Sequence, residues 1–353
     1  DELNAYTVFE TLNSRGVELT STDLLKNFLF SLVAKSKTDL KNVKNQWKKI
    51  IDAVGLKEFP IFLRYYLVAT RKQITKEYLF KEIKSFIKNA EDVFDLLDSL
   101  EFYAYNYIAL GNSDDQLWNT DKELRININV LKAFRVTQWK PLALVAYEKL
   151  SNQDFKKLIN AIVSISFRYN VVAKLQTNEM EKVYSKAAIN LYKGNTQNLQ
   201  MVINDLKSIY VNDEDFRNYF MTKQFRTANS TEQKLARYTL YKLESQENNG
   251  NSYDFTIDDG TIEHILPENP SEDWLEFFDE ESIEKYIYSV GNLTLLEAKK
   301  NNREASNKIF SEKERIYHTS KFAITKNITY PEWNQETIKN RQAHLSKLAT
   351  GIW

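Results

Sequence analysis

The segment Gly260-Thr-Ile-Glu-His-Ile-Leu-Pro267 predicts the architecture of the C-terminal part of this chain. Its β-branched and aliphatic residues are typical of a strand, and Pro267 ends it because proline cannot donate to a strand ladder. Just before it, Phe255-Thr-Ile257 precedes the turn Asp258-Asp-Gly260. These features predict a short hairpin over residues 255–266.

Further along the chain, the pattern continues as loop, strand and helix. An acidic, aromatic loop runs to about Tyr288, and Gly291-Asn-Leu-Thr-Leu-Leu296 is a second strand-like segment. Residues 299–318 show the spacing of a charged amphipathic helix. Strand, long loop, strand and helix is therefore the predicted local order.

The pattern of the first 227 residues is different, and it predicts a bundle of long helices with short connections. Apolar residues recur at helical spacing, for example at Leu25, Phe28 and Leu29 after a capping segment at Thr20–Asp23. The whole chain has only five prolines and eight glycines to interrupt such helices. We predict a mainly α protein with a helical bundle at 1–227 and a second domain at 228–353.

The amino-acid composition excludes several kinds of function. The 353 residues carry 48 basic and 48 acidic side chains, no cysteine and three histidines. The absence of cysteine excludes disulfides, thiol nucleophiles and cysteine-ligated zinc, and it favours a cytoplasmic location. No apolar run approaches the roughly 18 residues that span a bilayer, so no membrane partner is expected. The first residue is Asp1, and we expect a piece of a longer protein.

The charges are unevenly distributed. Residues 251–289 hold twelve acidic residues and one lysine, whereas residues 290–353 hold eleven basic and six acidic residues. An acidic loop repels phosphates unless a metal or basic neighbours compensate it, and a basic tail attracts them.

Glu263 and His264 are the most chemically suggestive pair. Adjacent strand residues face opposite sides, so they cannot both point into a core, and a buried unpaired carboxylate is costly. One role for such a pair is metal-assisted hydrolysis. The carboxylate and a helix-borne amide oxygen hold a hard divalent cation, and the histidine deprotonates a water. An asparagine opposite the histidine could fix its tautomer through the side-chain carbonyl.

These motifs together resemble a known family. The acid-histidine strand at 263–267, the Gly291-Asn-Leu strand and Asn301-Asn302, with Asn307 and Lys313 downstream, are similar to the HNH or His-Me finger nuclease domain of GmrSD-type, modification-dependent (type IV) restriction proteins. The resemblance covers about the last 120 residues. It implies a small ββα-metal finger inside the second domain.

The resemblance implies a role for each matching residue. His264 would be the general base, Asn292 would orient it, and Glu263 would be a metal ligand for Mg²⁺ or Mn²⁺. Asn301 and Asn302 are both candidates for the second ligand, because each fits a different part of the motif spacing. The basic residues of the following helix would contact DNA phosphates; they are Lys299, Lys300, Arg303, Lys308 and Lys313. A solvated helix face with salt bridges is the alternative interpretation of these five residues.

The N-terminal end is similar to the same family. Phe9-Glu-Thr-Leu-Asn-Ser-Arg-Gly16, with Leu19 to Asn27, matches the segment after the family's ParB/sulfiredoxin-like nucleotide-binding domain. That domain has no counterpart in this sequence, so any nucleotide site would lie in it.

The resulting hypothesis is a divalent-metal-dependent DNA endonuclease of a restriction and antiviral defence protein. Its expected partners are DNA, including base-modified DNA, and either a second copy or the N-terminal domain. A catalytically dormant nucleic-acid-binding or assembly module is the alternative, and a helical scaffold with an incidental Glu263-His264 pair is the third hypothesis.

Overall fold

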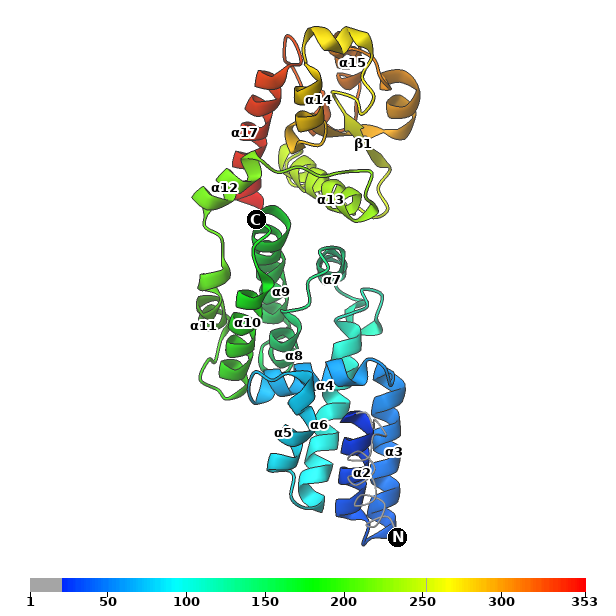
Figure 1. Ribbon diagram of the computed structural model, residues 1–353, viewed down its shortest axis with the longest axis vertical. Helices are drawn as coiled ribbons and strands as arrows, with labels where there is room; N and C mark the ends of the chain where they lie inside the picture. Colours follow the sequence, from blue (N-terminus) through cyan, green and yellow to red (C-terminus); the bar gives the residue numbers. More distant parts are fainter. Residues whose placement is uncertain (1–20, 252) are drawn as a thin grey trace. The chain divides into compact units, whose positions relative to one another are not determined.

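The computed structural model describes residues 21–251 and 253–353 of the chain (Figure 1). The family-like segment Phe9–Gly16 lies outside these residues. The described chain divides into two compact units. The first comprises the described residues up to Asn129, together with Val136–Ile162 and Gln176–Ile209. The second comprises Val130–Arg135, Val163–Leu175 and Tyr210–Trp353.

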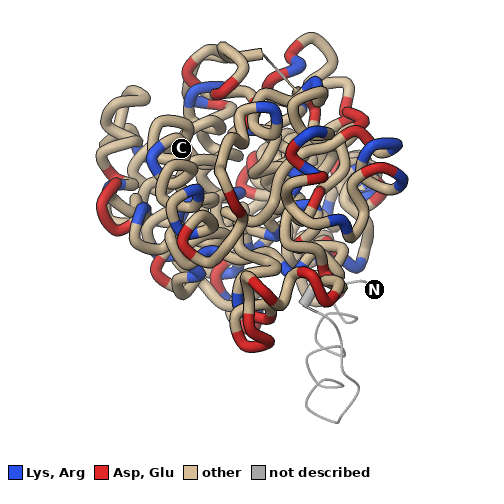
Figure 2. The backbone as a smooth tube through the Cα atoms, turned by 90° about the horizontal axis from the view of Figure 1, so that it is seen from above, with Lys and Arg blue, Asp and Glu red and all other residues tan. Residues whose placement is uncertain are grey.

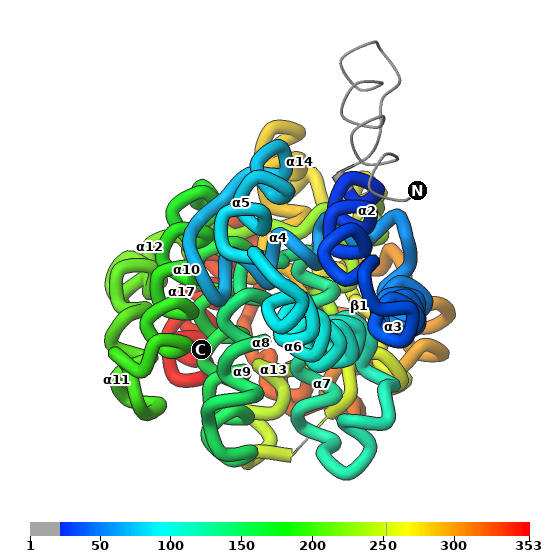
Figure 3. Tube along the Cα trace, turned by 90° about the horizontal axis from the view of Figure 1, so that it is seen from below, coloured from blue at the N-terminus to red at the C-terminus, as the bar shows by residue number. Residues whose placement is uncertain are grey.

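Every secondary-structure element in the described residues of the first unit is a helix. Its elements are α2 (Ser21–Val33), α3 (Lys37–Val54), α4 (Phe59–Thr70), η1 (Lys76–Tyr78), α5 (Leu79–Phe86), α6 (Ala90–Ala109), η2 (Gln116–Trp118), the first part of α7 (Lys122–Ala133), α8 (Lys140–Lys149), most of α9 (Asn152–Ser166), α10 (Thr177–Tyr192), α11 (Leu199–Asp205) and η4 (Lys207–Ile209). Helix α3 packs against α2 and α6, and α2 and α3 lie side by side in two views (Figures 1 and 3). The predicted helical stripe is confirmed in α2, where Leu25, Phe28 and Leu29 are buried.

The second unit holds the only sheet in the described residues. Its elements are the π-helix η3 (Phe167–Val172), α12 (Asp213–Met221), α13 (Ser230–Glu247), β1 (Gly260–His264), η5 (Glu272–Glu276), α14 (Glu280–Tyr286), η6 (Val290–Asn292), β2 (Leu293–Glu297), the π-helix η7 (Lys300–Ala305), α15 (Phe310–Tyr317), α16 (Ala323–Lys326) and α17 (Gln335–Ile352). Strands β1 and β2 pair antiparallel, with Gly260 opposite Glu297 and His264 opposite Leu293. The prediction of a mainly helical protein with a small C-terminal sheet is confirmed.

The predicted hairpin at 255–266 is wrong. Residues 255–257 form a turn, and the partner of β1 is β2, which lies about 30 residues downstream. The cause is Arg237 of α13, whose guanidinium donates to the backbone carbonyls of Phe255, Asp258 and Gly260. The carbonyls of Phe255 and Asp258 are thus satisfied by a side chain, so the residues before β1 need no strand partner.

The predicted single helix at 299–318 is also wrong. It is split into η7 and α15 by Ser306, whose φ is 38° and ψ is −126°. This left-handed backbone region strongly disfavours any residue with a Cβ, so a continuous helix cannot pass through it. The break leaves residues 306–307 as a short turn beside the end of β1.

A hydrophobic core fixes these elements around the sheet. It includes Ile265 and Leu266 after β1, Leu296 of β2, and the buried indoles of Trp274 and Trp333. Helix α17 starts with a capping box at Asn334 and Thr337, which satisfies backbone N–H groups of its first turn. None of the described helices is both long and apolar enough to cross a membrane.

Candidate functional site

A polar pocket of about 240 Å³ lies at the end of β1. It gathers most of the residues that the sequence singled out, and its lining consists of Glu263, His264, Pro267, Glu268, Asn269, Asn301, Asn302, Ser306 and Asn307. Among the residues that the structure describes, no lysine or arginine lines it. The carboxylate, imidazole and amide groups therefore dominate its chemistry.

Glu263 lines this pocket and forms a buried ion pair with Lys313. Its Oε1 atom accepts hydrogen bonds from Nζ of Lys313 at 2.8 Å and from the hydroxyl of Tyr317 at 2.6 Å, both on α15. Burial raises the pKa of the Glu263 carboxyl, and the Lys313 ammonium partly offsets this. Burial likewise lowers the pKa of Lys313, against the attraction of Glu263.

The second oxygen of Glu263 is free. In the described part of the chain, Oε2 accepts no hydrogen bond, and it is not among the fully enclosed polar atoms. Because Glu263 lines the pocket, this oxygen is the one available to a ligand there.

Asn301 and Asn302 come from the π-helix η7. The amide nitrogen of Asn301 donates to Oγ1 of Thr261 and to the carbonyl oxygen of Ile262, each at 2.9 Å, and so fastens the helix to β1. With its nitrogen held there, the Oδ1 atom of Asn301 is left as a fixed acceptor. The side chain of Asn302 is exposed and makes no hydrogen bond among the described residues. Single π-turns such as η7 are frequent at functional sites.

His264 also lines the pocket, and its side chain is mostly buried. Its Nε2 atom is 3.0 Å from Oγ1 of Thr227, and Oγ1 is 3.2 Å from Oε1 of Glu268. The ring of Tyr288 packs edge-on against the imidazole, with the centroids 6.0 Å apart. Burial lowers the pKa of His264 to about 4, and the nearby Glu268 carboxylate opposes this shift. The imidazole is therefore neutral at physiological pH.

The side chain of Asn292 makes no hydrogen bond to His264, contrary to the expectation that it orients the imidazole. It is completely buried, and its Oδ1 accepts from the backbone N–H of Leu266 and from Nε1 of Trp333. Its Nδ2 donates to the carbonyls of Leu266 and Ile287. All the hydrogen-bonding capacity of this amide is used, so its role is to join the end of β1 to the loop before β2.

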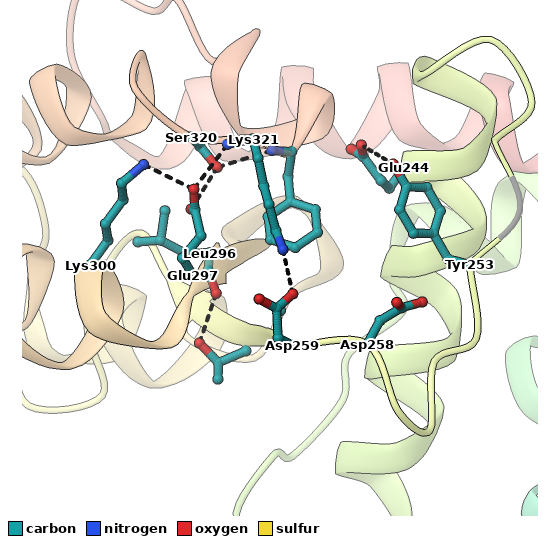
Figure 4. A network of polar contacts seen from close by, with 12 residues as sticks. Glu244, Tyr253, Asp258, Asp259, Leu296, Glu297, Lys300, Ser320 and Lys321 are labelled. Carbon is teal, nitrogen blue, oxygen red and sulfur yellow. Dashed lines mark hydrogen bonds and ion pairs between the residues drawn. The ribbon is translucent and has the colours of Figure 1, made fainter.

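The five basic residues predicted to meet DNA do not form one group. Lys299, Arg303 and Lys308 are exposed. Lys300 donates to Oε1 of Glu297 and to the carbonyl of Thr319, within the network shown in Figure 4. Lys313 is fully buried against Glu263, so the prediction that it contacts a DNA phosphate is wrong. Figure 2 shows basic and acidic residues at many separate places along the backbone.

Thr227 and Glu268 are site residues that the sequence interpretation missed. Glu268 stands four residues after His264, and that spacing, with Pro267 between them, is a usable signal. Thr227 lies 37 residues before His264 with no local motif. It reaches the site because Lys223 to Thr227 runs beside Tyr288 to Val290, with the N–H of Phe225 donating to the carbonyl of Tyr288.

The pocket fits a hard divalent cation. Across the described residues, no three histidine, aspartate or glutamate side chains form a ready-made metal cluster. The pocket instead offers the open Oε2 of Glu263, the Glu268 carboxylate and several amide oxygens. Mg²⁺ takes oxygen ligands, keeps several waters and needs only one or two protein carboxylates, so this donor set suits it.

The residues that line this pocket lie in a segment that matches a known family. Residues 210–348 match the family model of the GmrSD restriction endonucleases, C-terminal domain. A comparison with curated proteins gives no match. The family-like motifs at 263–302 thus lie inside a GmrSD restriction endonuclease C-terminal domain, and the resemblance is confirmed for that part of the chain.

Proposed function

We propose that this GmrSD C-terminal domain is a divalent-metal-dependent nuclease of the HNH or His-Me finger type, which hydrolyses DNA phosphodiesters at the pocket beside β1. The family supplies the setting of restriction defence and implies a DNA substrate. The observation that carries the proposal is the convergence of Glu263, His264 and Asn301 on one polar pocket. The order β1, β2, η7 then corresponds to a ββα-metal finger whose helix is a π-turn.

The proposed reaction uses the neutral imidazole of His264 and the free side-chain oxygens of Glu263 and Asn301. The neutral imidazole of His264 accepts a proton from a water, whose oxygen forms a bond to phosphorus while the bond to the 3′ oxygen breaks. The leaving oxygen takes up a proton from solvent. A bound cation would stabilise negative charge on the phosphate and the leaving oxygen. Oε2 of Glu263 and Oδ1 of Asn301 would hold it, with Asn302 as the alternative amide.

Three exposed cations extend the site toward the substrate. Lys299, Arg303 and Lys308 lie on or beside η7, and their exposed side chains can reach DNA phosphates, although Lys308 also lies 3.8 Å from Oε2 of Glu312. The pocket itself has no basic lining, so phosphate attraction at the reacting centre depends on the cation. We propose residues 228–353 as the nuclease domain and base-modified DNA as its target.

Plasmid cleavage by the whole chain tests the proposal. Supercoiled plasmid, unmodified or glucosylated, is incubated with Mg²⁺ or Mn²⁺, and the matched variants are His264→Ala and His318→Ala. His318 is an exposed histidine at the end of α15, outside the pocket. We expect nicking that EDTA abolishes, that His264→Ala abolishes and that His318→Ala retains. Equal cleavage by the two variants would disprove the assignment of His264 as the base.

A binding module without catalysis is the second candidate. It is favoured by the burial of the Glu263 carboxylate against Lys313, which occupies one of the two oxygens that a metal could use. Retarded migration of plasmid without any cleavage, on both DNAs and with both metals, would support this function.

A further inference from the structure

The hydroxyl of Thr227 lies between His264 and Glu268. Oγ1 is 3.0 Å from Nε2 of the imidazole and 3.2 Å from Oε1 of the carboxylate, whereas Nε2 and Oε1 are 3.7 Å apart. The threonine is therefore the link between the other two groups, which do not bond to each other directly.

The direction of the two hydrogen bonds follows from proton counting. A hydroxyl has one proton to donate, and an ionised carboxylate can only accept. Thr227 therefore donates to Glu268, and its oxygen lone pair faces Nε2 of His264. That contact is favourable only if Nε2 carries the ring proton, since two lone pairs would otherwise meet. The neutral imidazole is held as the Nε2–H tautomer.

The other ring nitrogen is left unprotonated. Within residues 21–251 and 253–353, Nδ1 of His264 has no hydrogen-bond partner, and it is not among the enclosed polar atoms. A base needs an accessible lone pair, and Nδ1 is the nitrogen that has one. The sequence predicted that Asn292 would fix the tautomer of His264, but all the hydrogen bonds of the Asn292 amide go to other groups.

The backbone holds Thr227 in this place. The N–H of Phe225 binds the carbonyl of Tyr288, and the N–H of Arg226 binds Oε2 of Glu232 in the first turn of α13. Thr227 itself is only 8% exposed. A buried side chain on a backbone held by these hydrogen bonds loses little entropy when it orients a neighbour, so it is preorganised for this role.

We propose that Thr227, supported by Glu268, is a positioning residue that locks His264 in the Nε2–H tautomer and leaves Nδ1 as the basic nitrogen. The catalytic meaning of this lock rests on the proposed nuclease function. The hydrogen-bond chain itself can be tested without any cleavage.

The test is ¹⁵N–¹H correlation spectroscopy of the whole chain labelled only at histidine, which gives three imidazoles to assign. An imidazole N–H is seen when a buried hydrogen bond slows its exchange. The variants are Thr227→Val, which keeps the shape without the hydroxyl, and Thr227→Ser, which keeps the hydroxyl. Thr239→Val is the matched control, because Thr239 is a buried threonine of α13 whose hydroxyl binds only the carbonyl of Leu235. His264→Gln assigns the signal.

We expect the wild type and the Thr239→Val and Thr227→Ser variants to show a protonated Nε2 and an unprotonated Nδ1 at His264. Thr227→Val should lose the Nε2–H signal and lower kcat about tenfold at unchanged KM, with recovery in Thr227→Ser. A merely structural role would change neither the tautomer nor the ratio of kcat to KM in this way.

Different results would contradict the nuclease function and the role of Thr227. A wild-type protein with the locked tautomer but no nuclease activity would overturn the proposed function and leave the hydrogen-bond chain intact. Cleavage that is equal in Thr227→Val and Thr239→Val, or a protonated Nδ1 in the wild type, would overturn the role of Thr227 and leave the nuclease in place.

Discussion

The Nζ atom of Lys313 lies 2.8 Å from Oε1 of Glu263 and 2.8 Å from the carbonyl oxygen of His264. One buried ammonium therefore binds the two neighbouring residues at the end of β1, one by its side chain and one by its backbone. It holds α15 against the strand and fixes which oxygen of Glu263 is left to face the pocket.

Removing this ammonium should cost much of the stability of the domain. Lys313→Met keeps the length of the side chain but leaves a carboxylate buried without its cation, and we expect a loss of about 3 to 5 kcal/mol in the free energy of unfolding. Tyr317→Phe removes one hydrogen bond to the same oxygen and should cost about 1 to 3 kcal/mol. Urea unfolding followed by tryptophan fluorescence measures both.

The double variant Glu263→Gln with Lys313→Met provides the control. Because it removes both charges, it should lose less free energy of unfolding than the single variants Glu263→Gln and Lys313→Met lose in sum. Additive losses would show that the pair is not coupled, and a Lys313→Met variant as stable as the wild type would contradict the prediction.

The pH dependence of stability should reveal the buried imidazole. Burial lowers the pKa of His264 from 6.5 to about 4, so between these values the unfolded chain binds a proton that the folded protein does not. The stabilising contribution is complete above pH 6.5 and is lost as the pH falls toward 4. We expect this group to account for about 1.4 kcal/mol per pH unit inside that window.

Urea unfolding of the wild type and of His264→Gln at several pH values between about 7 and 5 measures this slope. The wild type should lose stability more steeply than the variant as the solution is acidified. Parallel curves would mean that the imidazole is protonated in the folded protein as easily as in the unfolded chain.

Both strands could be predicted from the sequence, but their pairing could not. The β-branched residues around Ile262 and Leu295 favour strands wherever they lie. The choice of partner depends on Arg237, which is about 20 residues from the turn whose carbonyls it binds. Local pattern favours the nearest segment, and a side chain arriving from another helix overrides it.

The pocket could be predicted residue by residue only where a motif is local. Glu263, His264 and Asn301 are recognisable from residue type and order. Whether a given amide faces the histidine depends on rotamer and packing, and this is why Asn292 was assigned the task that Thr227 performs. The burial of Lys313 was equally invisible, because its spacing fits an exposed helix face.

The two asparagines of η7 should differ in their effects on metal binding. Asn301 is held against β1 through its amide nitrogen, so its oxygen is preorganised, whereas Asn302 is exposed and unrestrained. We expect Asn301→Ala to weaken Mn²⁺ binding about tenfold. Asn302→Ala should change the stability by less than about 0.5 kcal/mol and affect Mn²⁺ binding less. Calorimetric Mn²⁺ titration measures the affinities, and a larger effect of Asn302→Ala would make Asn302 the ligand.

Glycine in place of Ser306, in the strained turn after η7, should stabilise the protein. Ser306 has a φ of 38° and a ψ of −126°, which glycine adopts without a Cβ clash. Ser306→Gly should raise the free energy of unfolding by about 1 kcal/mol, while Ser306→Ala should give no gain. Equal stability of the glycine and alanine variants would show that the turn relaxes in solution.

The last prediction concerns how the domain holds DNA. Lys299, Arg303 and Lys308 are exposed, whereas Lys300 is bound to Glu297 and to the carbonyl of Thr319. Each phosphate contact releases condensed counterions, so the logarithm of the binding constant falls with the logarithm of salt concentration by about 0.9 per contact. Replacing the three exposed residues with glutamine should reduce this slope by up to about 3. The matched single variant Lys300→Gln should leave the slope unchanged. Fluorescence anisotropy of a labelled duplex across a salt series measures it, and equal slopes for the triple variant and the wild type would place the DNA on another surface.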